Sequence, residues 1–271
     1  MAEMTEAELL QKNEELHRRQ AQVAALKASG EPKAASVGEI IGGGAVAGSD
    51  NFKEKLAGLV RRIESDGPRE PDTERDEIKK LTAEAAEEKR LKDSGVPGRY
   101  MAETFDTYKP RSDEEAKNLA AVRKFAEDSR RGYAGFLVML GGNGTGKSHL
   151  GNACIHELEG LYVDIPTLEI EVECSRDFSA PENKMQVLNK YVCAPFLVID
   201  EIGRTTSPAV ERGILYYILN KRYNLRKDTV LITNYTAKEL DDNLGKAIMD
   251  RIAEKRVRVE FTGQSYRRGN R

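Results

Sequence analysis

The chain has 271 residues, of which 32% are charged and 39% are apolar, and its formal net charge is −2. That length suffices for one good-sized domain and a smaller region, and the near-neutral total excludes a general attraction to nucleic acid or membrane surfaces. The charge is nevertheless uneven, because residues 251–271 sum to +5 and follow an acidic body. Such asymmetry indicates either an anionic partner or a solvated basic tail.

Cysteine usage and hydropathy exclude further classes of protein. The three cysteines form no C-x-x-C pair, so neither a zinc site nor a disulfide framework is expected. No apolar run approaches the roughly 18 residues of a membrane span, and the N-terminus lacks a basic-then-apolar signal pattern. We therefore expect a soluble cytoplasmic protein with no membrane contact.

Residues 1–98 are rich in Ala, Glu, Lys and Leu and predict a helical N-terminal region. A capping box of Thr5 and Glu8 opens the first helix, and residues 42–50 form a Gly-rich linker. The next helix has a one-sided apolar stripe, and another charged helix runs from about residue 73 to Ser94. These helices either form a small bundle or complete their apolar faces with a partner protein. The stripe consists of Phe52, Leu56, Leu59, Val60 and Ile63.

After GVPG at 95–98, short apolar runs alternate with helical patterns. Buried strands that alternate with helices predict an α/β fold, with a parallel sheet between helices over residues 99–271. We expect strands at 134–140, 161–165, 196–200, 229–233 and 257–261, and helices at 147–159, 183–191 and 209–223, with two short helices before the last strand.

The segment GGNGTGKS at 141–148 fits the pattern G-x-x-x-x-G-K-[ST] between a predicted strand and a predicted helix. Glycines allow backbone N–H groups to face phosphates, and the following helix N-terminus adds positive potential. Lys147 would reach the β- and γ-phosphates of ATP, and the Ser148 hydroxyl would bind Mg²⁺. The expected nucleotide contacts are Gly141, Gly142, Asn143, Gly144, Thr145, Gly146, Lys147, Ser148 and His149.

Polar residues lie at the ends of the strands expected at 196–200 and 229–233. FLVIDEIG ends a strand in two acids, which places Asp200 at the carboxyl edge of the sheet as an Mg²⁺ ligand. Glu201 can polarise a water for attack on the γ-phosphate, which favours ATP hydrolysis over phosphoryl transfer to a metabolite. Asn234, after the strand at 229–233, either orients that water or serves as an ordinary turn residue.

Together, GGNGTGKSHL, FLVIDEIG, LITNYT, LGKAIMDRI and SYRR resemble the AAA+ ATPase domain of DnaC-type replicative helicase loaders, a branch that also holds IstB-like transposition ATPases. The resemblance covers roughly residues 99–271, with TFDTY at 104–108 similar to the adenine-proximal segment. It implies that Asn234 is sensor 1, that Arg251 is an arginine finger acting on a neighbouring subunit, and that Arg267 is sensor 2.

The resemblance also implies partners. It suggests a spiral, of six copies, that grips single-stranded DNA through the segment at 166–184, where Phe178 would stack on a base. By analogy, the N-terminal helices would bind a hexameric DnaB-like helicase. One departure concerns the helix after the acids, where Pro208 and Val210 cannot supply the polar and aromatic DNA contacts of DnaC-type loaders.

The sequence therefore predicts an ATP-dependent loader that places a hexameric replicative helicase on single-stranded DNA, with hydrolysis resetting or releasing the loader. The alternative is an IstB-like transposition ATPase that binds DNA and a transposase. Two further alternatives are a P-loop metabolite kinase and a scaffold whose nucleotide site is inactive. In the kinase, Arg251→Ala would leave the ATPase activity unchanged, and in the scaffold, Lys147→Ala would leave the function intact.

Overall fold

The computed structural model describes residues 54–55, 57–58, 61–62, 71–177 and 179–266, and divides the chain into two compact units, Met1–Ile78 and Lys79–Arg271. In the first unit, the described residues between 54 and 62 are helical, within the region where the sequence predicts a helix. A long charged helix, α4 (Pro71–Asp93), runs into the second unit and ends one residue before the expected Ser94.

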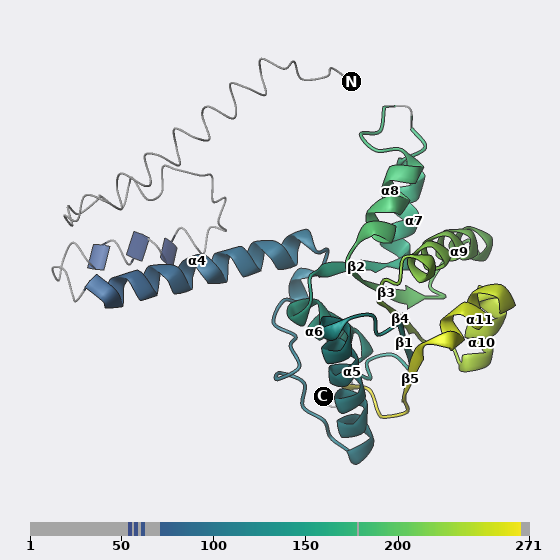
Figure 1. Cartoon of the computed structure of the whole chain (residues 1–271), viewed down its shortest axis with the longest axis horizontal. Helices are drawn as coiled ribbons and strands as arrows, with labels where there is room; N and C mark the ends of the chain where they lie inside the picture. Colours follow the sequence, from purple (N-terminus) through teal and green to yellow (C-terminus); the bar gives the residue numbers. More distant parts are fainter. Residues whose placement is uncertain (1–53, 56, 59–60, 63–70, 178, 267–271) are drawn as a thin grey trace. The chain divides into compact units, whose positions relative to one another are not determined.

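The second unit is built on a parallel five-stranded sheet in the order β2-β3-β4-β1-β5 (Figure 1). Because β4 lies between β1 and β3, the loop after β4 meets the loops after both of these strands at the carboxyl edge. The predicted fold class is confirmed, and the strands lie within about two residues of their expected bounds. They are β1 (Phe136–Gly141), β2 (Gly160–Asp164), β3 (Phe196–Ile202), β4 (Thr229–Thr233) and β5 (Arg256–Phe261).

Helices cover both faces of the sheet, and the central strands are therefore buried on both sides. On β1, Leu137 and Met139 pack into one apolar cluster with α5 (Asp113–Arg131) and α6 (Lys147–Glu157). Val138 and Leu140 belong to the opposite cluster. That cluster includes side chains of α7 (Ile165–Cys174), α8 (Lys184–Cys193), α9 (Pro208–Asn224), α10 (Ala237–Leu244) and α11 (Lys246–Glu254).

Two of these helices have no counterpart in the sequence analysis. α5 begins at Ser112, whose side chain accepts a hydrogen bond from the Glu115 N–H, and its first turn is acidic. α7 occupies the first half of the segment expected to line a DNA channel, and Asp164 caps it by accepting from the Thr167 N–H at 2.8 Å. Both helices thus carry ordinary local start signals.

The end of α4 is joined to the end of α6 within the second unit. The Arg90 guanidinium donates to the carbonyls of Ile155, His156 and Leu158 at 3.0, 3.2 and 3.3 Å. These carbonyls belong to the last turn of α6 and its cap, where backbone acceptors have no partner within the helix. Arg90 therefore caps the helix that begins at the phosphate-loop motif.

None of the described helices combines the length and the apolar character needed to cross a bilayer.

Candidate active site

The loop between β1 and α6 has the backbone form that the GGNGTGKS motif predicts. Gly144 and Gly146 have φ values of 75° and 95°, which side-chain-bearing residues rarely adopt. A Cβ on Gly146 would lie 2.7 Å from the ring of Tyr108, so glycine is also needed there for space. No side chain of the described residues caps the start of α6, and its first N–H groups are therefore open to an anion.

Lys147, the first residue of α6, is buried and extends its ammonium group back over this loop. Its Nζ donates to the carbonyls of Gly141 and Gly142 at 2.6 and 2.7 Å, and to Oδ1 of Asn234 at 3.0 Å. The Nδ2 of Asn234 donates in turn to Oδ1 of Asn143 at 2.9 Å. The structure thus brings the predicted lysine and the predicted sensor asparagine into direct contact.

Asp200 lies toward the end of β3 and is only 3% exposed. Its carboxylate accepts from the Tyr162 hydroxyl at 2.9 Å and from the Glu201 N–H at 2.6 Å. Burial raises the pKa of Asp200, and this effect outweighs hydrogen bonds from Ser148, the Glu201 backbone and Tyr162. Oxygen donors on a buried acid and a neighbouring hydroxyl are the ligands that Mg²⁺ prefers, so the residues fit that ion.

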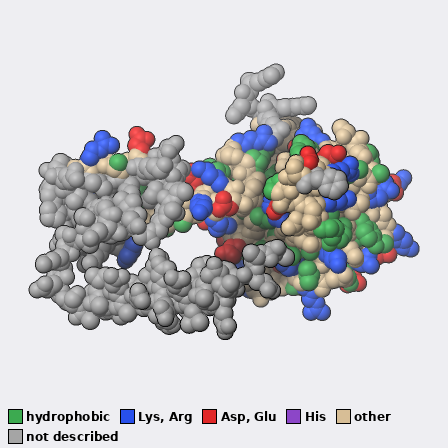
Figure 2. All heavy atoms as spheres, turned by 90° about the horizontal axis from the view of Figure 1, so that it is seen from above, with side chains coloured by type: hydrophobic (Ala, Val, Ile, Leu, Met, Phe, Trp, Pro, Cys, Tyr) green, Lys and Arg blue, Asp and Glu red, His purple; other side chains and the backbone are tan. Residues whose placement is uncertain are grey.

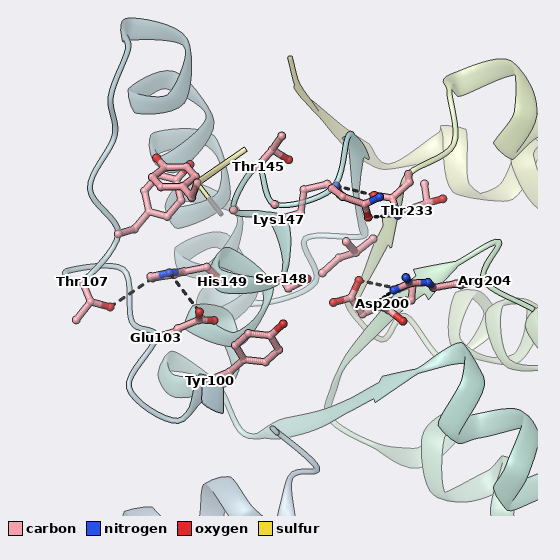
Figure 3. Close-up of a pocket in the computed structure, with 18 of the residues that line it drawn as sticks. Tyr100, Glu103, Thr107, Thr145, Lys147, Ser148, His149, Asp200, Arg204 and Thr233 are labelled. Carbon is pink, nitrogen blue, oxygen red and sulfur yellow. Dashed lines mark hydrogen bonds and ion pairs between the residues drawn. The ribbon is translucent and has the colours of Figure 1, made fainter. Parts of the chain in front are cut away.

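Glu201 occupies a strained position at the carboxyl edge. Its φ is 55°, and the pairing of β3 with β4 shifts register between Ile199 and Ile202. Such irregularities turn a side chain out of the regular alternation of a strand and are common at active sites. The Glu201 carboxylate forms an ion pair with Arg204 at 2.6 Å, and the Arg204 side chain lies beside Asp200 (Figure 3).

A buried residue on α9 supports this turn. Glu211 is fully buried, and its Oε1 accepts a hydrogen bond from the Gly203 N–H at 2.7 Å. Burial raises the pKa of Glu211, and the bond from Gly203 offsets part of that effect. The start of α9 is therefore attached to the segment that carries Glu201.

The loop after β1 and the side chains of Lys147, Asp200 and Glu201 surround a cavity of about 410 Å³. Of the predicted site residues, Asn143, Gly144, Thr145, Gly146, Lys147, Ser148, His149, Asp200, Glu201 and Asn234 line it. Gly141 and Gly142 lie at the base of the loop, where their carbonyls bind Lys147. Thr107 and Tyr108, which also line the cavity, belong to the TFDTY segment that resembles the adenine-proximal segment of the family. The remaining lining residues were not predicted from the sequence, namely Tyr100, Glu103, Lys109, Arg204, Ile232, Thr233 and Tyr266.

Other predicted residues lie elsewhere. Arg251 is in the last turn of α11, does not line the cavity, and donates to the Ala247 carbonyl of its own helix at 3.1 Å. Arg251 therefore does not contribute to the cavity of its own protomer. Arg267, Phe178, Phe52, Leu56, Leu59, Val60 and Ile63 lie outside the described residues.

The chain is similar in sequence to proteins of a known family. The sequence model of the IstB-like ATP binding proteins matches residues 83–271. The replicative helicase loader DnaC of Escherichia coli strain K12 is 30% identical over 179 residues, which are 64% of this chain and 73% of that protein. DnaC of Buchnera aphidicola subsp. Acyrthosiphon pisum is 29% identical over 164 residues, 59% of this chain and 66% of that protein, so about a third of the Buchnera loader is not matched.

Among solved structures, the crystal structure of the DnaC helicase loader matches with a TM-score of 0.55 at 24% identity. The match covers 61% of this chain and 100% of that chain. At this level of identity, the match shows that the two chains share a fold and nothing further. The sheet order and the phosphate loop define a P-loop domain of the AAA+ class. The chain belongs to the IstB/DnaC family of ATP-binding proteins, and the resemblance predicted from its motifs is confirmed.

Proposed function

We propose that this protein is an ATP-hydrolysing loader that binds a hexameric replicative helicase and places it on single-stranded DNA. The observation that carries the proposal is the convergence of Lys147, Asn234, Asp200 and Glu201 on one cavity at the carboxyl edge of the sheet. Membership of a family whose curated relatives are named replicative helicase loaders supports the choice of partner.

In this proposal, each residue of the cavity has a separate role in ATP hydrolysis. The loop N–H groups and Lys147 bind the phosphates, and Ser148 and Asp200 hold Mg²⁺, which neutralises phosphate charge when bound. Glu201 is the general base for water, and Asn234 orients the γ-phosphate or that water. Contact between Lys147 and Asn234 supports a shared γ-phosphate position, because the ammonium group would exchange its carbonyl partners for phosphate oxygens when a nucleotide binds.

The partner contacts belong to the same proposal. The helical region 1–98, including the Phe52–Ile63 stripe, would bind the helicase, and residues 99–271 would form the ATPase domain and assemble in a spiral. Phe178 would stack on single-stranded DNA, and Arg267 would sense the nucleotide. Anisotropy of a labelled oligonucleotide in the presence of ATP measures the DNA contact, and no change at low salt would exclude it.

An IstB-like transposition ATPase is not favoured, because the curated relatives compared above are named replicative helicase loaders. The charge on one face of the molecule is in keeping with this preference. On the face shown in Figure 2, acidic and basic side chains of the described residues are intermixed, rather than forming the broad basic surface that duplex binding calls for.

Arg251→Ala is expected to reduce ATP hydrolysis by at least roughly 10²-fold and to leave ATP binding by the monomer intact. The reason is that Arg251 lies away from its own cavity and would supply charge to the transition state of a neighbouring subunit. Phosphate release measures hydrolysis, and Lys246→Ala, which removes an exposed cation from the same helix, is the matched control.

Mixing two inactive variants distinguishes action in trans from action in cis. Arg251→Ala protomers retain the ATP site, whereas Lys147→Ala protomers retain the finger. If Arg251 acts on a neighbour, the mixture regains part of the activity that each variant lacks alone. An inactive mixture, or an Arg251→Ala variant as active as the wild type, would refute the trans assignment.

A further inference from the structure

The segment that follows Glu201 is held by side chains from two helices. The N–H of Gly203 donates to Oε1 of Glu211 on α9 at 2.7 Å. The hydroxyl of Thr205 donates to Oε1 of Glu169 on α7 at 2.5 Å. Gly203 is only two residues beyond Glu201, so the bond to Glu211 acts on the backbone that carries the acid.

Gly203 has no side chain through which this segment could be anchored. Its φ is 91°, and a Cβ at this position would overlap the ring of Tyr235, which follows the sensor residue Asn234. Glycine is therefore required both for the backbone conformation and for space. The backbone N–H of Gly203 is its one hydrogen-bond donor, and Glu211 is the acceptor that this donor has.

Glu211 is a costly residue to place at this position if stability alone is considered. It is fully buried, and its Oε2 has no hydrogen-bond partner in the part of the chain that the structure describes. Burial raises the pKa of Glu211, and the nearby charge of Glu169 raises it further. Because an apolar side chain of similar size would avoid this desolvation cost, the carboxyl indicates a role beyond packing.

Glu211 also has a neighbour on α10. Asn243 is only 9% exposed, and its amide acts on Glu211 to lower the pKa of that carboxyl. The Nδ2 of Asn243 lies 3.5 Å from the hydroxyl of Tyr235, the residue whose ring packs against Gly203. A buried polar network thus joins the segment after the acid pair to α10.

We propose that Glu211 is a positioning residue for ATP hydrolysis, which places the Glu201 carboxylate by holding the N–H of Gly203, and that Asn243 holds Glu211 in turn. The inference rests on the proposed role of Glu201 as the base for water and deepens it. Glu211 does not line the cavity, whereas Lys147 and Ser148 do. The substitution of Glu211 should therefore affect the chemical step and not the binding of ATP.

Steady-state hydrolysis by the full-length protein, combined with calorimetric titration of ATP, tests this assignment. Glu211→Met keeps the length of the side chain but offers no acceptor to Gly203. It is expected to lower kcat by roughly 10-fold, with KM for ATP and ATP affinity within about 2-fold of the wild-type values. Glu211→Gln retains an oxygen acceptor and should keep kcat within about 3-fold of the wild type.

Asn243→Leu tests the same network without altering Glu211, and it should lower kcat by about 3-fold with ATP affinity unchanged. The double variant Glu211→Met/Asn243→Leu should lose no more activity than Glu211→Met, because both residues act through one carboxyl. Matched controls are Arg212→Met and Asp242→Leu, which change the exposed neighbours of the two residues and should not alter kcat.

The outcomes separate a positioning role from a merely structural one. An unchanged kcat in Glu211→Met, or a loss of ATP affinity as large as the loss of kcat, would overturn the inference. Equal losses of kcat in Glu211→Gln and Glu211→Met would also overturn it, since the acceptor would then be irrelevant. A wild-type protein that binds ATP without hydrolysing it would instead refute the proposed function.

Discussion

Glu201→Gln is expected to reduce ATP hydrolysis by at least roughly 10²-fold while ATP binding remains near the wild-type level. The carboxylate belongs to the strained end of β3 and lines the cavity, where we propose that it acts as the base for the attacking water. An amide of the same shape cannot accept the proton, but it keeps the bulk and one oxygen acceptor. Phosphate release and nucleotide titration measure the two quantities separately.

The matched control for Glu201→Gln is Glu173→Gln, which neutralises an exposed acid of α7 in an ion pair with Arg176. The control should hydrolyse ATP at the wild-type rate. A Glu201→Gln protein that retains hydrolysis would show that another group activates the water, and the role assigned to the acid pair would be wrong. Loss of binding as well as hydrolysis would show a structural role for Glu201.

Arg222→Ala is expected to lower the free energy of unfolding by about 3–5 kcal/mol, the largest stability effect we anticipate. Arg222 is fully buried and donates to the carbonyls of Tyr191, Val192, Ala194 and Asp228 and to the Thr229 hydroxyl. Burial lowers the pKa of Arg222 to about 10, so the side chain remains charged at neutral pH. Its removal would leave these buried acceptors without their donor at the end of α8 and the start of β4.

Urea unfolding followed by circular dichroism measures this change. Lys221→Ala, at the neighbouring exposed position of α9, is the control and should change the stability by less than about 0.5 kcal/mol. A midpoint for Arg222→Ala equal to that of the control would contradict the structural role of the buried guanidinium.

Local sequence signals predicted the sheet and the backbone form of the loop between β1 and α6 well. Strands buried on both faces appear as continuous apolar runs, which explains why β1, β3 and β4 could be located from composition alone. The loop glycines and Lys147 form a contiguous motif, and the spacing of its residues is itself the signal for phosphate binding. α5 was missed although Ser112, its acidic first turn and Gly132 are ordinary helix signals, and α7 was missed because its segment was assigned to a DNA channel.

Contacts between distant segments could not be predicted in the same way. Tyr266 and Glu115 are 151 positions apart, and only the fold brings them into hydrogen-bond contact. Arg222 has the sequence character of a solvated helical cation, and its burial depends on packing between α8, α9 and β4. Arg204 follows the acid pair closely, but its ion pair with Glu201 depends on the irregular turn after β3.

Mixing the full-length protein with a hexameric replicative helicase and ATP, followed by size-exclusion chromatography with light scattering, tests the central claim most directly. The account predicts a stable complex whose mass exceeds that of the helicase hexamer by several copies of this chain. Failure to form a complex, under conditions in which the same preparation binds ATP, would contradict the assignment as a helicase loader.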